Sequence, residues 1–315
     1  MYRVLKAVYN QKALLILILV FVYSSLFVPY FFTFNNLSNV MMQISIYGIM
    51  ALAMTFVILN GEFDLSIGAV MTFAGVIVSK MAPHMNIFAA IAITVLLGAL
   101  IGLIVGILVG IFRLNSFIVT LCAMFVLNGI AYKMSDARPV VNLDPFLDWL
   151  GNGKTLMIPN LFWILVIAFV IADYTLRRTK FGRNIYAVGG DQQVAILTGI
   201  SVRFYKVSVF VISAVAASVA GILLTGMLNA GSPFVGGAAA LTVISGVVIG
   251  GTSLAGGEGG VRQTIVGMLL LGVLENSLNL MNVNPFYQTL ILGLLLVIAI
   301  GMDCYARNRK LAHSL

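Results

Sequence analysis

Charged residues are scarce in this sequence. Of its 315 residues, 18 are lysine or arginine and 10 are aspartate or glutamate, so only 9% are charged. A typical soluble domain has roughly a quarter. Hydrophobic residues make up 61% of the chain, and the mean hydropathy is +1.08. This balance excludes an ordinary soluble domain and indicates an integral membrane protein.

Cysteine and histidine are scarcer still, with two of each. Cys122 lies in an apolar run and Cys304 near the basic C-terminal end, so they form neither a disulfide framework nor a metal-ligand spacing. His84 and His313 are isolated. No Ser/His/Asp arrangement is evident. We therefore expect no metal, no cofactor and no catalytic residues in this chain, which we do not expect to be an enzyme.

One stretch superficially resembles a phosphate-binding loop. The residues "GNGKT" run from Gly151 to Thr155, but the motif requires a glycine five positions before the Gly-Lys pair, where this chain has Asp148. The stretch also follows no predicted strand. We do not expect ATP to bind here.

Long apolar runs dominate what is present. Helices satisfy their own backbone hydrogen bonds in lipid, and these runs lack the alternation of an outer-membrane barrel. The sequence thus predicts an all-α integral membrane protein with one transmembrane domain over 1–315. The third and eighth segments are short or glycine-rich, so we expect broken or re-entrant segments. About ten transmembrane helices are predicted, near 13–30, 40–59, 66–81, 87–111, 115–132, 157–175, 205–226, 237–254, 261–281 and 284–302.

The basic residues indicate an orientation. With the N-terminus inside, 14 of the 18 face the cytoplasm, and only Lys80, Lys133, Arg138 and Lys154 face outward. This asymmetry follows the positive-inside rule and predicts that both termini are cytoplasmic. It also explains the net charge of +8 without nucleic acid. Two connections are long: an outward loop over 133–156 and a basic cytoplasmic loop over 176–205.

Two carboxylates interrupt the apolar pattern in "NGEFDLSIG". Ionisable residues inside a membrane are functional candidates, so Glu62 and Asp64 form a candidate proton-coupling pair. The alternative is that Asp64 caps a helix beginning near Leu65, since an acid favours a helix N-terminus. We favour capping for Asp64 and leave the role of Glu62 open.

The cytoplasmic loop contains a short helical pattern. Asp191 follows two glycines and can start a helix, and Gly199 can end it. The residues alone leave two alternatives equally open, a solvated connection or a helix that inserts into a groove on a partner protein.

Glycines are dense around the eighth predicted span. They fit close helix packing, or else a broken backbone that lines a substrate path. The segment "GGTSLAGG" (Gly250–Gly257) is polar for the centre of a span and echoes "GEFDLSIG" (Gly61–Gly68). We take this echo as a weak indication that the two halves of the chain build one site.

At these residues the chain resembles a known family, the permease subunits of bacterial ABC importers for ribose, xylose, galactose and similar sugars. The segment from Gly61 to Gly75 is similar to the family's "GGIDLSVGSVMALAG", and Ser116 to Met124 to "PFIVTLGTM". Gly189 to Ile200 is similar to "GGNxxAAxLSGI", and Gly250 to Val283 to "GGTSLxGGxG…GVLxNGLNLLGV". The resemblance covers nearly the whole chain in order.

The resemblance implies a complex in the bacterial inner membrane. Two permeases would form a homodimer or heterodimer with separate cytoplasmic ATPase subunits, which hydrolyse ATP, and an extracytoplasmic substrate-binding protein. The short loop helix then corresponds to the coupling helix that contacts the ATPase. Its expected contact residues are Gly190, Asp191, Gln192, Gln193, Ala195, Thr198 and Gly199.

The chain departs from the family pattern in places. Glu62 replaces a glycine, Asp191 an asparagine and Val194 an alanine, while Gln263 stands where glycine is usual. Glu62 puts the substrate in doubt, because a carboxylate near the pathway can bind sugar hydroxyls or favour a cationic solute. Val194 and Asp191 are candidates for tuning the fit to the ATPase.

The leading hypothesis is an ATP-driven importer subunit for a monosaccharide or related polar solute. The alternatives are a permease for nucleosides or other small solutes and, in a different class, an ion-coupled transporter that uses Glu62 and Asp64. Hydroxyl-rich solutes need hydrogen-bond donors and acceptors rather than fixed charge. The candidate translocation pathway comprises Glu62, Asp64, Ser66, Thr252, Ser253, Asn276, Asn279 and Gln288.

Overall fold

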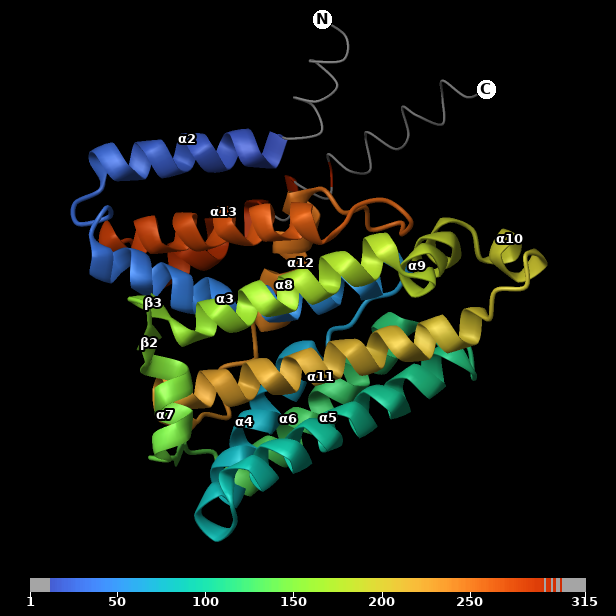
Figure 1. Cartoon of the computed structure of the whole chain (residues 1–315), viewed down its shortest axis with the longest axis horizontal. Coiled ribbons are helices and arrows are strands. Elements are labelled where there is room, and N and C mark those ends of the chain that lie inside the picture. The colour runs from blue at the N-terminus through green and yellow to red at the C-terminus, as the bar shows by residue number, and fades with distance from the viewer. Residues whose placement is uncertain (1–11, 292, 296, 299–300, 302–315) are drawn as a thin grey trace, which may run out of the picture.

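The computed structural model describes residues 12–291, 293–295, 297–298 and 301. In this part of the chain nearly all regular structure is helical (Figure 1), and six helices are long and apolar enough to cross a membrane. The prediction of a helical, multi-span membrane protein is therefore confirmed. These helices are α3 (Phe34–Leu59), α4 (Ile67–Met81) with the 3-10 turn η1 (Ala82–His84), α5 (Ile87–Gly110), α6 (Ser116–Ser135), α8 (Asn160–Arg178) and α11 (Val202–Leu228).

The predicted count of about ten spans is not confirmed. Helix α2 (Lys12–Phe27) has 16 residues and α12 (Ala239–Gly250) has 12. A 12-residue helix is about 18 Å long, well short of the ~30 Å hydrocarbon core. Helix α13 (Val261–Leu280) carries Arg262 and Glu275 and is not among the six. The tenth predicted span begins as a short apolar helix at Pro285 and runs into residues outside those described.

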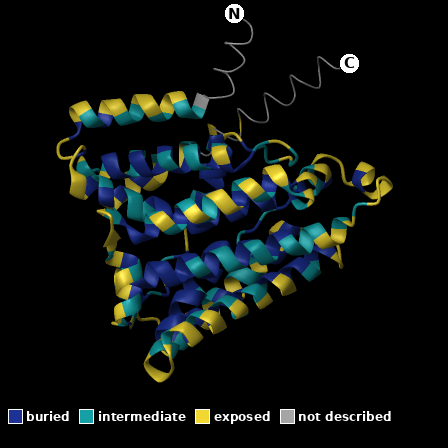
Figure 2. Cartoon of the chain, viewed as in Figure 1, coloured by how far each residue is buried: buried dark blue, intermediate teal, exposed yellow. Residues whose placement is uncertain are grey.

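The long helices form an inner and an outer set. Helices α3, α4 and α11 are mostly buried, with 83% of the most apolar stretch of α3 inside the protein, whereas the corresponding figure for α6 is 17%. The outer helices α5, α6 and α8 carry many exposed residues (Figure 2). Large apolar side chains are among them, for example Leu96, Phe125 and Ile171. These side chains identify the surface that faces lipid.

The two long predicted loops lie at opposite ends of the bundle (Figure 1). This arrangement is compatible with the prediction that the two loops lie on opposite faces of the membrane. One end carries α9 (Lys180–Gly190) and α10 (Gln192–Leu197). The other carries α7 (Pro145–Asn152) and two small antiparallel pairings, β1 (Val140–Val141) with β4 (Ala230–Gly231) and β2 (Lys154–Thr155) with β3 (Ile158–Pro159).

Helix α4 begins inside the bundle rather than at one of its ends. Helix α3 ends beside α9, and the chain from Asn60 to Ser66 then returns into the bundle without helical structure (Figure 1). Hydroxyl groups of α6 accept hydrogen bonds from two backbone amides of the segment 60–66. The amide of Phe63 donates to Ser116 Oγ (3.3 Å) and that of Leu65 to Thr120 Oγ1 (3.1 Å). Non-helical backbone at membrane depth is tolerated when protein groups satisfy it in this way.

Helix α12 is a partial span. Residues 233–238 form turns before it, and the loop over 251–260 connects it to α13. Helix α12 packs mainly against α13 and α3. The prediction that the third and eighth segments are broken agrees with a non-helical segment, 60–66, before α4 and with the short helix α12.

Candidate coupling surface and polar pathway

The short helix of the predicted cytoplasmic loop is present where the sequence predicts it. Helix α10 spans Gln192–Leu197 with Asp191 at its N-cap. The Asp191 carboxylate accepts hydrogen bonds from the backbone amides of Gln193 (2.8 Å) and Val194 (3.0 Å). These bonds satisfy two of the donors that every helix leaves unpaired at its start.

The other end of α10 closes through a glycine. Gly199 has φ +77°, the left-handed conformation that favours glycine. Its amide donates to Ile196 O (3.0 Å), and the amide of Ile200 donates to Ala195 O (2.9 Å). This pair of bonds is the Schellman arrangement. Both ends of α10 are therefore fixed by its own residues.

Helix α10 directs apolar side chains outward. Leu197 is 86% exposed, Ile196 60% and Val194 55%, whereas Ala195 is buried. Exposed apolar residues on a capped helix at the end of the molecule indicate a contact surface for another protein. We call Val194, Ile196 and Leu197 the coupling surface.

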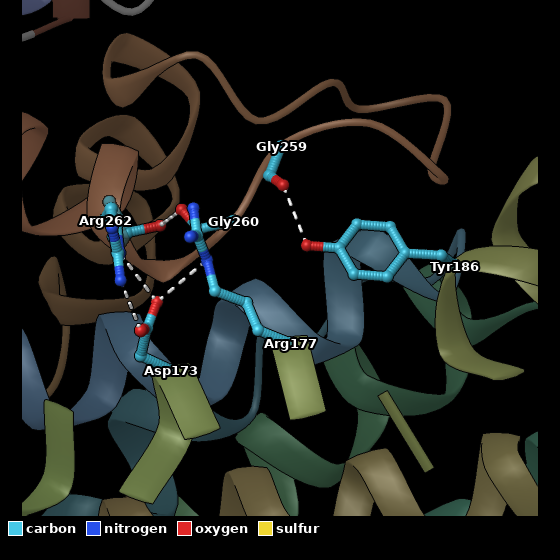
Figure 3. A network of polar contacts seen from close by, with 7 residues as sticks. Asp173, Arg177, Tyr186, Gly259, Gly260 and Arg262 are labelled. Carbon is cyan, nitrogen blue, oxygen red and sulfur yellow. Dashed lines mark hydrogen bonds and ion pairs between the residues drawn. The ribbon is translucent and has the colours of Figure 1, made fainter. Parts of the chain in front are cut away.

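The residues just before α10 pack against the end of α3. A Cβ on Gly189 would lie 1.7 Å from Leu59 O and 2.9 Å from Gly257 N, so only glycine allows this approach. The amide of Gly257 donates to the same Leu59 carbonyl (3.0 Å), and Tyr186 Oη of α9 donates to Gly259 O (2.9 Å; Figure 3). Three segments therefore meet behind α10: 59–62, 186–190 and 256–260. We call this meeting point the glycine junction.

The glycine junction also brings the two echoing motifs together. Gly256 lies against Gly61: a Cβ on Gly256 would be 3.0 Å from Gly61 Cα. The two echoing motifs thus touch through their backbones, at the end of the bundle that carries α9 and α10.

Glu62 forms an ion pair next to this junction. Its Oε1 lies 2.5 Å from Lys206 Nζ in the first turns of α11, and the two side chains are only 9% and 15% exposed. Because Lys206 lies a few residues beyond α10, the pair connects the non-helical segment 60–66 to the helix that follows the coupling surface. The structure therefore gives Glu62 an ionic partner.

Asp64 is fully buried among hydroxyl groups. Its Oδ1 accepts from the amide (2.9 Å) and hydroxyl (2.5 Å) of Ser66, and its Oδ2 accepts from Ser213 Oγ of α11 (2.6 Å). The predicted cap is corrected in detail: α4 begins at Ile67 and Ser66 holds the N-cap position. Asp64 binds the residue before the helix, and it also ties α4 to α11.

The other pathway candidates lie apart from Asp64. Thr252 and Ser253 belong to the loop after α12, where the Gly260 amide donates to Thr252 Oγ1. Asn276 of α13 exchanges two amide hydrogen bonds with Asn36 of α3 (2.9 and 2.8 Å). Gln288 Nε2 donates to Asn279 Oδ1 (2.8 Å). The eight predicted residues thus take part in several separate sets of polar contacts within the described chain.

Several residues in these contacts were not singled out from the sequence. Lys206, Ser213 and Asn36 are each far along the chain from their partners, so no local spacing relates them. At the end of α8, Asp173 accepts from Arg262 Nε (3.0 Å) and Nη2 (2.9 Å) (Figure 3). The positive-inside count places Arg262 on the cytoplasmic side but gives no hint of its partner.

Helix α7 is attached to α11 at the opposite end. Asp148 Oδ1 accepts from Asn152 Nδ2 (2.9 Å) and from Asn229 Nδ2 (3.2 Å), just after α11. These two hydrogen bonds hold the pKa of Asp148 below its usual value. The hydrogen bond from Asn229 thus attaches part of the predicted outward loop to the end of α11.

The fold and these contacts define a class: a multi-span helical membrane protein with one short partial span, α12, and a capped helix with exposed apolar side chains at one end. The chain belongs to the family described as the branched-chain amino acid transport system permease component, which matches residues 36–300.

Curated relatives agree with this assignment. The chain is 37% identical to a ribose import permease protein of Haemophilus influenzae over 96% of this chain and 95% of the relative. It is 38% identical to that of Escherichia coli K12 over 93% of both. An L-arabinose transport system permease protein of E. coli K12 is 36% identical over 96% and 93%. No solved structure matches the chain.

Proposed function

We propose that this chain is the permease subunit of an ATP-driven importer for a monosaccharide. Relatives that match nearly its whole length are named as ribose and L-arabinose permeases. ATP hydrolysis belongs to a separate ATPase subunit, and a substrate-binding protein delivers the sugar. We further propose that two permeases pair, as identical or different chains, and that the chain lies in the bacterial inner membrane with both termini cytoplasmic.

The observation that carries the coupling role is the rigid, exposed helix α10. We propose that the coupling surface sits in a groove of the ATPase. Because α10 is capped at both ends, movement of the ATPase displaces it as a unit. Gly189 and Lys206 flank this helix on either side and contact the 59–62 segment. Displacement of α10 thus reaches the glycine junction, which we propose is the cytoplasmic gate.

The sugar path is proposed to follow the non-helical segment 60–66 and the loop over 251–260. Asp64, Ser66 and Thr252 belong to these segments. Asn276, Asn279 and Gln288 supply amide groups from α13 and the chain beyond it. Such groups suit hydroxyl recognition, and the non-helical backbone of these two segments is of the kind on which many transporters build their sites.

Reconstitution of the permease tests this proposal. Proteoliposomes with the chain alone should take up no ribose or arabinose under a proton gradient, because the chain has no energy source of its own. Uptake should appear when the ATPase, ATP and the sugar-loaded binding protein are present. Proton-driven uptake by the chain alone would overturn the proposal in favour of ion coupling through Glu62 and Asp64.

Replacing Asp191 with lysine is expected to weaken ATPase binding. The substitution removes two capping hydrogen bonds, worth about 1 kcal/mol together, and places a cation at the positive end of α10. We expect roughly a tenfold loss of ATPase co-purification and of sugar uptake.

Asp191→Asn is the matched control, because asparagine caps equally well and is the residue usual in the family pattern. This variant should keep ATPase binding and uptake. Equal losses in both variants would show that the carboxylate contacts the ATPase directly and that capping is not what matters.

A further inference from the structure

A cavity of about 520 Å³ opens on the outer surface where α8 approaches the start of α13. None of its lining residues belongs to the glycine junction or to the polar pathway candidates. Its lining combines three arginines and one carboxylate with three apolar or aromatic side chains. These residues are Phe169, Val170, Asp173, Tyr174, Arg177, Arg178 and Arg262.

The lining of the cavity changes from apolar to basic along α8. Phe169 and Val170 precede Arg177 and Arg178 by eight residues, or about 12 Å along the helix axis. Tyr174 lies between them and is 63% exposed. Tyrosine is enriched where the hydrocarbon meets the polar headgroups, so the cavity runs from an apolar floor inside the bilayer to a basic mouth at its surface.

The mouth carries excess positive charge. Arg262 Nε and Nη2 both donate to Asp173, and Arg177 Nε lies 3.2 Å from the same carboxylate, so this acid holds two guanidinium groups in place (Figure 3). One carboxylate offsets only one of the three arginines. The recorded contacts use two N–H donors of Arg262 and one of Arg177, out of five on each side chain. The remaining donors suit a phosphate.

We propose that this cavity binds an anionic phospholipid of the cytoplasmic leaflet, with its phosphate on the arginines and an acyl chain along Phe169 and Val170. The apolar floor distinguishes this from docking of the ATPase, because it lies within a membrane-spanning helix whose neighbouring side chains Ile167 and Ile171 face outward. The inference rests on the proposed orientation, which puts the basic end of α8 in the cytoplasm. Basic pockets between helices on that side are suited to acidic headgroups.

The test uses the full chain purified in a zwitterionic detergent. Dioleoylphosphatidylglycerol and dioleoylphosphatidylcholine are titrated separately, and binding is followed by native mass spectrometry. Phosphatidylglycerol should bind in a 1:1 complex at least tenfold more tightly than phosphatidylcholine. Arg177→Gln with Arg178→Gln should weaken phosphatidylglycerol binding on the order of 30-fold, from about fivefold per arginine. Both substitutions leave the Arg262–Asp173 contact intact.

Arg113→Gln with Arg203→Gln is the matched control, since it removes two exposed arginines outside the cavity. This variant should bind phosphatidylglycerol within about twofold of the unaltered chain. Equal weakening in both double variants, or no preference for phosphatidylglycerol, would overturn the proposal. Displacement of the lipid by millimolar inorganic phosphate would also overturn it, because the site would then recognise a free anion.

ATPase co-purification provides a further test of the lipid proposal. If the Arg177/Arg178 variant loses ATPase co-purification but keeps its lipid, the cavity is a protein-docking site and the lipid proposal fails. Because lipid binding is measured on the permease alone, failure of sugar uptake in reconstituted complexes leaves this result unaffected.

Discussion

Gly189→Ala is expected to uncouple ATP hydrolysis from sugar uptake. The added Cβ would lie 1.7 Å from Leu59 O, a backbone atom that cannot rotate away as a side chain would. The end of α9 must therefore move off the end of α3, which separates two of the three segments of the glycine junction. Overpacking of this kind costs about 1–3 kcal/mol, and 1.4 kcal/mol changes an equilibrium tenfold. We expect uptake to fall at least tenfold in reconstituted importers while ATP hydrolysis continues.

Gly190→Ala is the matched control one residue further on. A Cβ on Gly190 has no atom within 4 Å, so the same added methyl group meets open space. The glycine junction should stay closed in this variant, so a loss of coupled uptake here would report the ATPase contact expected of Gly190. If both variants keep coupled uptake, the glycine junction is not the gate; if both lose it, the effect arises from the ATPase contact of α10.

Lys206→Met is expected to destabilise the protein through Glu62. Removing one member of a buried ion pair leaves the other charge buried without compensation, at a cost of 3–5 kcal/mol in well-buried cases. The Lys206 side chain is 15% exposed, so we expect about 3 kcal/mol, the lower end of that range. Unfolding in mixed detergent micelles measures the loss of stability.

The double variant Glu62→Gln with Lys206→Met distinguishes an ion pair from a substrate contact. Replacing both charges removes the unpaired carboxylate, so most of the lost stability should return. Sugar selectivity should be unchanged. If stability is unaffected in the single variant while the preference between ribose and arabinose shifts, Glu62 acts on the substrate and the sequence-based interpretation of it as a specificity residue stands.

Features that depend on neighbouring residues in the sequence could be predicted. Contacts between residues far apart in the sequence could not. Asp191 and Gly199 define α10 because a capping side chain and a left-handed glycine act on their immediate neighbours. The partners of Glu62 and Asp64 could not be inferred in this way. Lys206 and Ser213 lie on α11, and only the packing of α11 beside the 60–66 segment brings them close.

The predicted span count is not confirmed for a related reason. Hydropathy reports the length of an apolar run, and the glycine-rich segment 237–254 is apolar enough to read as one span. Only α12, from Ala239 to Gly250, is helical there, because turns precede it and the left-handed Gly251 ends it. The hydropathy of this segment says nothing about where its backbone leaves the helix.

The hydrogen bonds of the non-helical segment 60–66 have a consequence for biosynthesis. The amides of Phe63 and Leu65 donate to hydroxyls of α6, and Asp64 accepts from a serine of α11, yet both helices emerge from the ribosome after α4. Bare backbone donors in lipid cost several kcal/mol each. We therefore expect the segment 60–66, and with it the start of α4, to take its final position only after α6 and α11 have been synthesised.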